Sequence, residues 1–272
     1  MSGITCKDCL TGSVQQGTPQ GTVETIHDLP TYVKRPESEP KGVVVIITDI
    51  FGWELANSRL LADFYAKEGG YIVYVPDFMN GNIPNSSAMH AMESLLAPSP
   101  SIFTTIFYKP LWALRVVMAA IPFLLTNREK QVLPKILSFH QALRDSTTLP
   151  VASAGFCWGG KYTILLSQRT EPALIDCAFT AHPSKMHFPD EYKKVKIPLS
   201  IAIGDVDMGI PIEMVKKIKG LLEEREGNEV VIYEGAKHGF AVRADPNDQG
   251  QVKSAEEARA QALKWFGRWL SS

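Results

Sequence analysis

A cysteine flanked by glycines is the part of this sequence best suited to chemistry. Cys157 lies within the stretch Ala154 to Gly160 (A-G-F-C-W-G-G), which follows a short apolar run and precedes a segment expected to be helical. Glycines at a sharp strand-to-helix turn avoid the collisions that side chains would cause there. The turn is expected to expose the sulfur, and the helix N-terminus favours a thiolate. We interpret Cys157 as a candidate nucleophile; the alternative is a small buried cysteine at a tight turn.

A thiol nucleophile needs a base, and the base needs an orienting group. Both are expected in loops at the carboxyl ends of parallel strands. His238 follows one strand-like run, and Asp207 follows another, with Asp205 as the reserve choice. The chain order of nucleophile, acid and histidine is one of the known orders for such a triad. His182 also follows a strand-like run and is expected either to line the pocket or to be an ordinary loop residue.

Strand-like and helix-like segments alternate along the chain, which predicts an α/β fold with a mostly parallel sheet and helices on both faces. Besides the strand before Cys157, the expected strands are 22–26, 31–33, 42–48, 71–75, 175–180, 199–203 and 229–233. The expected helices are 57–67, 134–144, 161–168, 212–224 and 254–270. The first two strands are predicted to be antiparallel and to lie at one edge of the sheet.

One strongly apolar segment, residues 102–125, interrupts this alternation within a longer insertion around 84–130. A membrane span is the obvious alternative, but two charged residues and two prolines interrupt the segment, and its uncharged runs are shorter than a crossing helix requires. A membrane-surface role would predict a strongly basic polar face. We predict instead a lid over the site, with Phe107 and Trp112 as substrate contacts, and no stable insertion into a membrane.

Composition limits the class of protein. The chain has 272 residues, of which 45% are apolar, and a net charge of −1, which predicts a single domain, 1–272, and argues against a nucleic-acid partner. The beginning of the chain does not resemble a signal peptide, and four cysteines indicate a reducing compartment, so we expect a cytoplasmic protein. Cys6 and Cys9 form a lone C-x-x-C, which is a weak zinc signal, and we interpret them as ordinary thiols.

Four short motifs resemble the dienelactone hydrolase family of the α/β-hydrolase fold, particularly its fungal members. They are D-I-F-G at 49–52, G-F-C-W-G-G at 155–160, G-D-V-D at 204–207 and K-H-G-F at 237–240. The resemblance implies an α/β-hydrolase fold. It also implies that Cys157 is the nucleophile and that Asp207 and His238 complete a catalytic triad.

The resemblance extends to residues around the triad. It implies, together with the elbow architecture, that the backbone N–H groups of Ile50 and Trp158 form the oxyanion hole. Bacterial members carry a glutamate at the position of Asp49, and in them that carboxylate takes part in thiol activation. Asp49 is one methylene shorter, and its alternative role is to cap a helix or a loop. Bacterial members also use an arginine in the loop after the histidine, for which Arg243 is the candidate.

These observations predict a hydrolase that cleaves a lactone or carboxylic ester through a cysteine nucleophile. The reaction needs no metal or organic cofactor. We expect a small-molecule substrate as the partner, and a monomer or homodimer. Two alternatives are a non-hydrolytic descendant, either a binding protein or a cyclase or dehydratase in a metabolite pathway, and a redox-sensing thiol protein. The redox alternative requires a resolving cysteine, for which Cys177 is the mid-chain candidate.

Overall fold

Strand β3 (Val43–Ile47) is buried over its whole length because both faces of the sheet are covered. Successive side chains of a strand point to opposite faces, so Val43, Val45 and Ile47 pack into one apolar core, and Val44 and Ile46 pack into the other. The computed structural model describes residues 13, 15, 17–84, 91, 94–95, 101–184 and 186–271. Cys6, Cys9 and part of the predicted insertion lie outside the described residues.

Eight strands form one sheet in the order β1-β2-β4-β3-β5-β6-β7-β8. Strands β1 and β2 pair antiparallel at one edge, β2 pairs antiparallel with β4, and all further pairs are parallel. The remaining strand bounds are β1 Thr22–Ile26, β2 Leu29–Lys34, β4 Ile72–Pro76, β5 Val151–Phe156, β6 Cys177–Ala181, β7 Leu199–Gly204 and β8 Glu229–Tyr233. The predicted mostly parallel sheet with an antiparallel edge is therefore confirmed.

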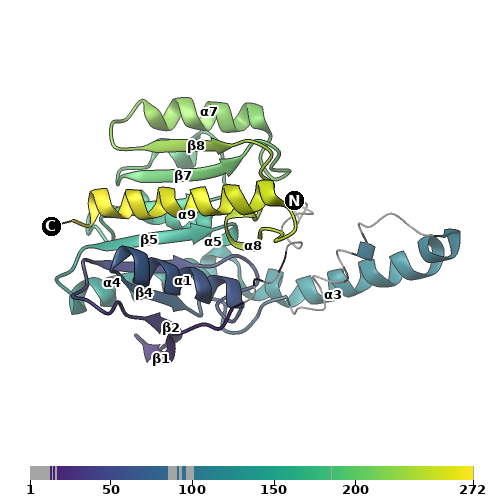
Figure 1. Ribbon diagram of the computed structural model, residues 1–272, viewed down its shortest axis with the longest axis horizontal. Helices are drawn as coiled ribbons and strands as arrows, with labels where there is room; N and C mark the ends of the chain where they lie inside the picture. Colours follow the sequence, from purple (N-terminus) through teal and green to yellow (C-terminus); the bar gives the residue numbers. More distant parts are fainter. Residues whose placement is uncertain are drawn as a thin grey trace.

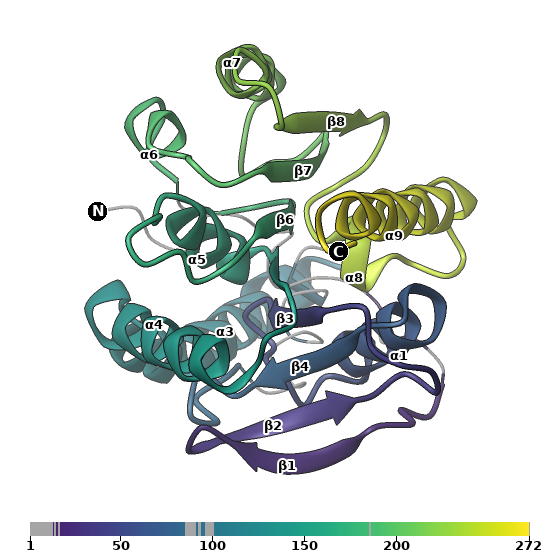
Figure 2. The same ribbon diagram turned by 90° about the vertical axis from the view of Figure 1, so that its left-hand side faces the viewer.

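Helices cover both faces of the sheet (Figures 1 and 2). One core contains side chains of α4 (Glu129–Ser146), α5 (Trp158–Ser167) and α7 (Ile212–Glu223). The other contains side chains of α1 (Ala56–Gly69) and α9 (Gln249–Trp269). Two short helices, α6 (Asp190–Lys193) and α8 (Phe240–Arg243), follow strands β6 and β8.

The predicted insertion lies between β4 and β5 but does not fold flat over the body of the protein. A turn of π-helix, η2 (Thr104–Tyr108), continues into α3 (Lys109–Thr126). Figure 1 shows α3 projecting away from the sheet and its covering helices. Only Val116 and Phe123 of α3 are buried. The side chains of its outer half are exposed, whereas we expected this segment to form a lid over the site.

Helices α4 and α9 each begin five residues earlier than predicted. Helix α4 begins at Glu129, so Pro134, which we expected to mark the helix start, lies inside it. Helix α9 begins at Gln249 because Asp248 caps it, with its Oδ1 accepting from the N–H groups of Gly250 and Gln251 at 3.1 and 3.2 Å. Sequence periodicity finds the apolar face of a helix, whereas the polar first turn carries no such signal.

Candidate active site

The turn that carries Cys157 has the strained backbone expected of a nucleophile elbow. Cys157 lies between β5 and α5 with φ 51° and ψ −112°, a conformation that side chains rarely adopt. A Cβ atom on Gly159 would lie 2.0 Å from the carbonyl oxygen of Ile47, and one on Gly155 would lie 2.4 Å from Thr163 Oγ1. Glycine is required at both positions because the turn packs directly against the neighbouring strand and its own helix.

The sulfur itself is not exposed, which corrects the prediction that the turn would expose it. Cys157 has 1% of its surface accessible. The loop after β6 covers it: the Ser184 N–H donates to the Cys157 carbonyl at 3.1 Å, and Ser184 Oγ lies 4.0 Å from Sγ. Ser184 is a site residue that the sequence reasoning missed, because it noted this loop only for His182. The proximity of Ser184 to the thiol depends on the parallel pairing of β5 with β6.

His238 and Asp207 meet in the buried interior, although 31 residues separate them. His238 Nδ1 lies 2.9 Å from Asp207 Oδ2 and 3.1 Å from Oδ1. Burial lowers the pKa of His238, but the negative charge of Cys157 and the hydrogen bond to Asp207 outweigh it and hold this pKa well above its usual value. Asp207 therefore holds the imidazole at Nδ1, and the charge of Cys157 acts on the same ring.

Asp205, the reserve choice for the acid, has a different contact. Its Oδ1 accepts a hydrogen bond from the Gly235 N–H at 2.8 Å, which joins the loop after β7 to the loop after β8. These loops are adjacent because β7 and β8 pair in parallel. The structure thus brings Asp207, rather than Asp205, to the histidine.

A buried ion pair lies next to the thiol. Arg243 Nε donates to Asp49 Oδ2 at 2.8 Å, with 1% and 0% of the two side chains exposed. The Phe51 N–H donates to the other carboxylate oxygen at 3.0 Å. Burial raises the pKa of Asp49, Arg243 opposes this shift, and the neighbouring charge of Cys157 adds to it. Both residues were expected near the site, but their pairing was not predicted because 194 residues separate them.

His182 packs against His238 and does not line an open pocket. It is fully buried, its ring centroid lies 5.0 Å from that of His238, and its backbone φ is 40°. Among the described residues, neither ring nitrogen finds a hydrogen-bond partner. Burial lowers the pKa of His182 well below its usual value, and the positive charges of His238 and Arg243 act in the same direction. His182 is therefore a neutral ring that packs against the imidazole.

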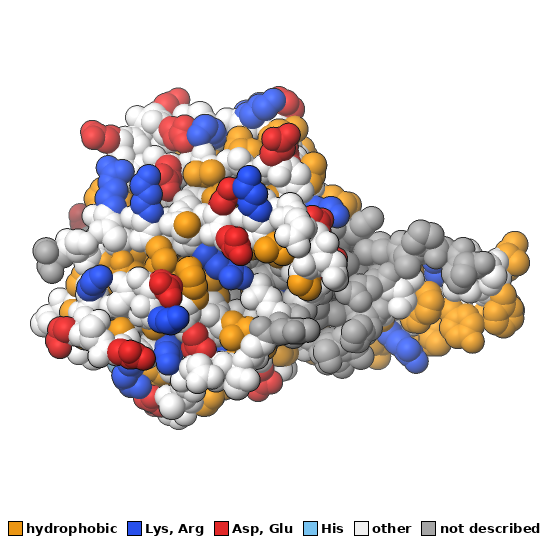
Figure 3. Space-filling model, viewed as in Figure 1, with side chains coloured by type: hydrophobic (Ala, Val, Ile, Leu, Met, Phe, Trp, Pro, Cys, Tyr) orange, Lys and Arg blue, Asp and Glu red, His pale blue; other side chains and the backbone are white. Residues whose placement is uncertain are grey.

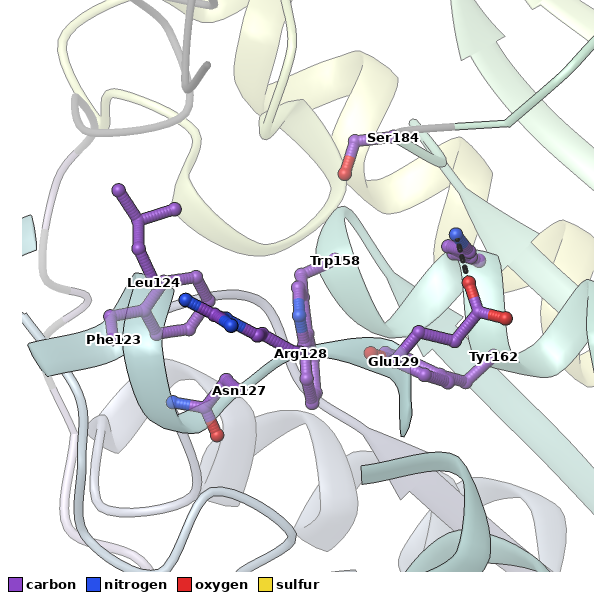
Figure 4. Close-up of a pocket in the computed structure, with 9 residues that line it drawn as sticks. Phe123, Leu124, Asn127, Arg128, Glu129, Trp158, Tyr162 and Ser184 are labelled. Atoms are coloured by element: carbon purple, nitrogen blue, oxygen red, sulfur yellow. Dashed lines mark ion pairs between the residues drawn. The ribbon is translucent and has the colours of Figure 1, made fainter. Parts of the chain in front are cut away.

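A cavity of about 250 Å³ adjoins the elbow through Trp158 and Ser184 (Figure 4). The end of the insertion supplies Phe123, Leu124 and Arg128 to its lining. Its remaining lining residues are Asn127, Glu129, Lys161 and Tyr162. The walls are thus partly apolar and partly cationic. Lys161 is paired with Glu129 at 2.6 Å, as the dashed line in Figure 4 marks.

The other predicted site residues lie at different depths. Ile50 and Trp158 are buried on either side of Cys157, at the ends of β3 and β5, where oxyanion donors are expected. Phe107, 60% exposed, lies in η2, and Trp112 lies in the first turn of α3, whereas the cavity meets the other end of that helix. Within the described part of the chain, no group of three or more His, Cys, Asp or Glu side chains could hold a metal ion.

Comparison with known proteins shows which family the chain belongs to. The dienelactone hydrolase family matches residues 29–270. The chain belongs to the dienelactone hydrolase family. The resemblance inferred from four short motifs is therefore confirmed over most of the sequence, and with it the expectation of a hydrolase.

Relatives and solved structures cover nearly the whole chain. Hydrolase tropI of Talaromyces stipitatus is 29% identical, covering 96% of this chain and 95% of its own. Hydrolase pyvD of Aspergillus violaceofuscus is 27% identical, covering 96% of each chain. A dienelactone hydrolase structure from Anabaena variabilis has a TM-score of 0.60 at 14% identity and covers 93% of this chain and 99% of its own. An esterase structure from Pyrococcus furiosus has a TM-score of 0.59 at 15% identity, covering 95% and 98%. The predicted α/β-hydrolase fold is confirmed.

Proposed function

We propose that the protein hydrolyses a lactone or carboxylic ester through Cys157 as nucleophile, His238 as base and Asp207 as orienting acid. The observation that carries this proposal is the buried hydrogen bond between His238 and Asp207, supported by the raised pKa of the imidazole, to which the charge of Cys157 contributes. A raised imidazole pKa is what a thiolate–imidazolium pair requires, because the proton released by the thiol then stays on the ring.

The reaction divides into two steps. The thiolate attacks the carbonyl carbon, and the C–O bond of the ester or lactone breaks to leave a thioester on Cys157. The leaving oxygen takes a proton from the His238 imidazolium. Water then loses a proton to His238 and attacks the thioester, which releases the acid and regenerates the thiolate. Backbone N–H groups of Ile50 and Trp158 hold the oxyanion in both steps, and the loss of one such donor costs about 10²–10³ in rate.

Asp49 and Arg243 are proposed to control the charge of the thiol. A carboxylate whose pKa is raised is a stronger proton acceptor than an ordinary aspartate. Its negative charge also disfavours a thiolate while the site is empty, and Arg243 moderates that charge. Arg243 is 2% exposed and pairs with Asp49 through Nε, so its contact with a substrate carboxylate, which the family resemblance implies, would use its terminal nitrogens and requires the site to open.

Buried charges distinguish this proposal from a binding protein, which is one form of the non-hydrolytic alternative. Asp49, Asp207, His238 and Arg243 are all almost completely buried around one sulfur. Burying ionisable groups costs free energy that a binding protein could avoid with apolar residues. The redox alternative is weaker, because Cys177 is fully buried in β6 and burial raises the pKa of its thiol far above the usual value.

The test is hydrolysis of p-nitrophenyl butyrate and of cis- and trans-dienelactone by wild type, Cys157→Ala and Cys157→Ser. We expect both variants to lose at least about 10³ in kcat/KM, because an alkoxide needs a stronger base and alanine has no nucleophile. Cys177→Ala is the matched control and should keep wild-type activity. Intact mass of the wild type mixed with ester should show an acyl adduct that Cys157→Ala lacks. Equal rates in wild type and Cys157→Ala would refute the nucleophile.

A further inference from the structure

The segment 101–126, here called the arm, presents an apolar surface that the described residues do not cover. Fifteen large apolar side chains of the described chain are exposed, and twelve of them belong to the arm. Ile102 is 80% exposed, and Phe107 and Met118 are each 60% exposed. Figure 3 shows these side chains gathered on the projecting part of the molecule. Soluble monomers rarely expose so large a contiguous apolar patch without a partner.

Six of the exposed side chains line the side of the helix that faces away from its own packing contacts. Val116 and Phe123, seven residues apart, form the inner side, which packs on the core. Met118 follows Val116 by two residues, which turns it about 200° around the helix. Six exposed residues recur at spacings of three and four and form the outer face: Phe107, Leu111, Leu114, Met118, Ile121 and Leu125. This outer face is therefore apolar except for Arg115, which lies four residues after Leu111 and three residues before Met118.

Both ends of the insertion return to the same place on the body. Asn127 Nδ2 donates to the Asn82 carbonyl at 2.8 Å, so the chain leaves and re-enters the body at neighbouring points. The helix Thr104–Thr126 is long and apolar enough to cross a membrane by length and composition alone. An insertion whose two ends lie on the same side of a bilayer would have to cross that bilayer twice. In addition, α3 carries the charged Arg115 at its middle. The geometry therefore favours an arm that lies on a surface over one that crosses a bilayer.

The charge of the arm indicates which apolar surface it fits. Within the arm the sequence contains Lys109 and Arg115 and no aspartate or glutamate, and Arg128, just beyond the arm, lines the cavity. A second copy pairing along the outer face would place only like charges beside one another, with no acidic partner in either arm. An anionic phospholipid surface supplies the opposite charge, and long basic side chains reach the headgroups while their stems lie on apolar surface.

We propose that the arm binds the surface of an anionic phospholipid bilayer, with its outer face at the boundary between headgroups and acyl chains. Apolar burial supplies most of the attraction, and the exposed Arg115 on the outer face favours anionic over neutral lipid. The same helix supplies Phe123 and Leu124 to the cavity beside Cys157. Binding would therefore place the mouth of that cavity next to the bilayer, where apolar esters concentrate. The surface contact itself does not depend on the proposed hydrolysis.

The test measures co-sedimentation of the full-length protein with extruded vesicles, in the absence of any substrate. One vesicle set is phosphatidylcholine, and the other contains roughly 30% phosphatidylserine, comparable to an anionic leaflet. We expect the wild type to sediment with the anionic set, less in high salt, and Met118→Glu to reduce the partition coefficient at least tenfold. Val23→Glu is the matched control: Val23 is 56% exposed in β1, and its substitution should leave binding unchanged.

Two results would overturn the proposal. One is wild-type protein that does not sediment with anionic vesicles, or that sediments equally well as Met118→Glu. The other is a wild-type dimer by light scattering that Met118→Glu converts to monomer while neither form binds vesicles, which would assign the outer face to a second copy. Thermal unfolding of Met118→Glu close to wild type would show that the variant is folded. Esterase activity is measured separately, so a failure of hydrolysis leaves the vesicle result interpretable.

Discussion

Two buried histidines show how neighbours, rather than burial alone, set the charge of a side chain. Burial lowers the pKa of His140 to about 4, and the hydrogen bond from its Nδ1 to the Ile136 carbonyl only partly opposes this. His238 is buried to a similar extent, but Asp207 and Cys157 supply negative charge and reverse the direction. The same residue type is therefore neutral in one helix and cationic in the site.

We predict that His238 titrates well above 6.5, its ordinary value, in the folded protein, whereas His140 stays neutral down to about pH 5. Two-dimensional ¹H–¹⁵N NMR of the imidazole nitrogens distinguishes the two states for both rings in one sample. Asp207→Asn should lower the pKa of His238 because the carboxylate charge is lost. A midpoint for His238 at or below 6.5, its ordinary value, would contradict the proposed ion pair.

The raised pKa of His238 also makes stability depend on pH. A group whose folded pKa lies above its unfolded value stabilises the fold fully below the unfolded value, near 6.5, and this contribution is lost as the pH rises through the folded pKa. The loss should be smaller in Asp207→Asn. Urea unfolding across this range measures the difference between the two proteins.

At the scale of elements, the elbow depends on how closely α5 approaches the sheet. We predict that Gly159→Ala destabilises the protein severely, because its Cβ would lie 2.0 Å from a backbone oxygen of β3 that cannot move aside. Gly220→Ala is the matched control: Gly220 lies in α7 with nothing within 4 Å of the added Cβ. That change should stabilise by about 0.5–1 kcal/mol. Urea unfolding of both variants is the measurement, and equal stabilities would be inconsistent with this packing.

The sequence predicts elements better than it predicts how they meet. The runs of β-branched residues identify the parallel strands, and the G-x-C-x-G pattern identifies the elbow, because each signal is local. The contact of Arg243 with Asp49 joins residues far apart in the chain, and no local pattern contains it. The projection of the arm from the body was not predicted for the same reason: an apolar composition suits a lid and a projecting helix equally.

At the scale of the whole molecule, the body and the arm differ in how they are held. Most of α3 lacks buried contacts, whereas the central strands β3, β5, β6 and β7 are buried over their whole length. Segments with few buried apolar contacts open at low free energy. The arm is therefore the described segment that we expect to open first.

We predict that trypsin makes its first cut within residues 17–271 after Arg115, which is exposed in α3. Lys109 precedes Pro110, a bond that trypsin does not cleave, so Arg115 is the first susceptible site along this helix. Mass spectrometry of the fragments identifies the cut, and Arg115→Gln should abolish it. Anionic vesicles should slow the cleavage if the arm lies on their surface. A first cut in the body instead would show that the arm is held more firmly than its contacts indicate.

The closing of the insertion at Asn82 and Asn127 has an evolutionary consequence. Because one hydrogen bond spans the two points where the chain departs and returns, extra residues there leave the positions of β4 and β5 unchanged. Relatives can therefore lengthen, shorten or exchange this insertion without changing the fold of the hydrolase body. A single catalytic framework can in this way be matched to substrates in very different surroundings.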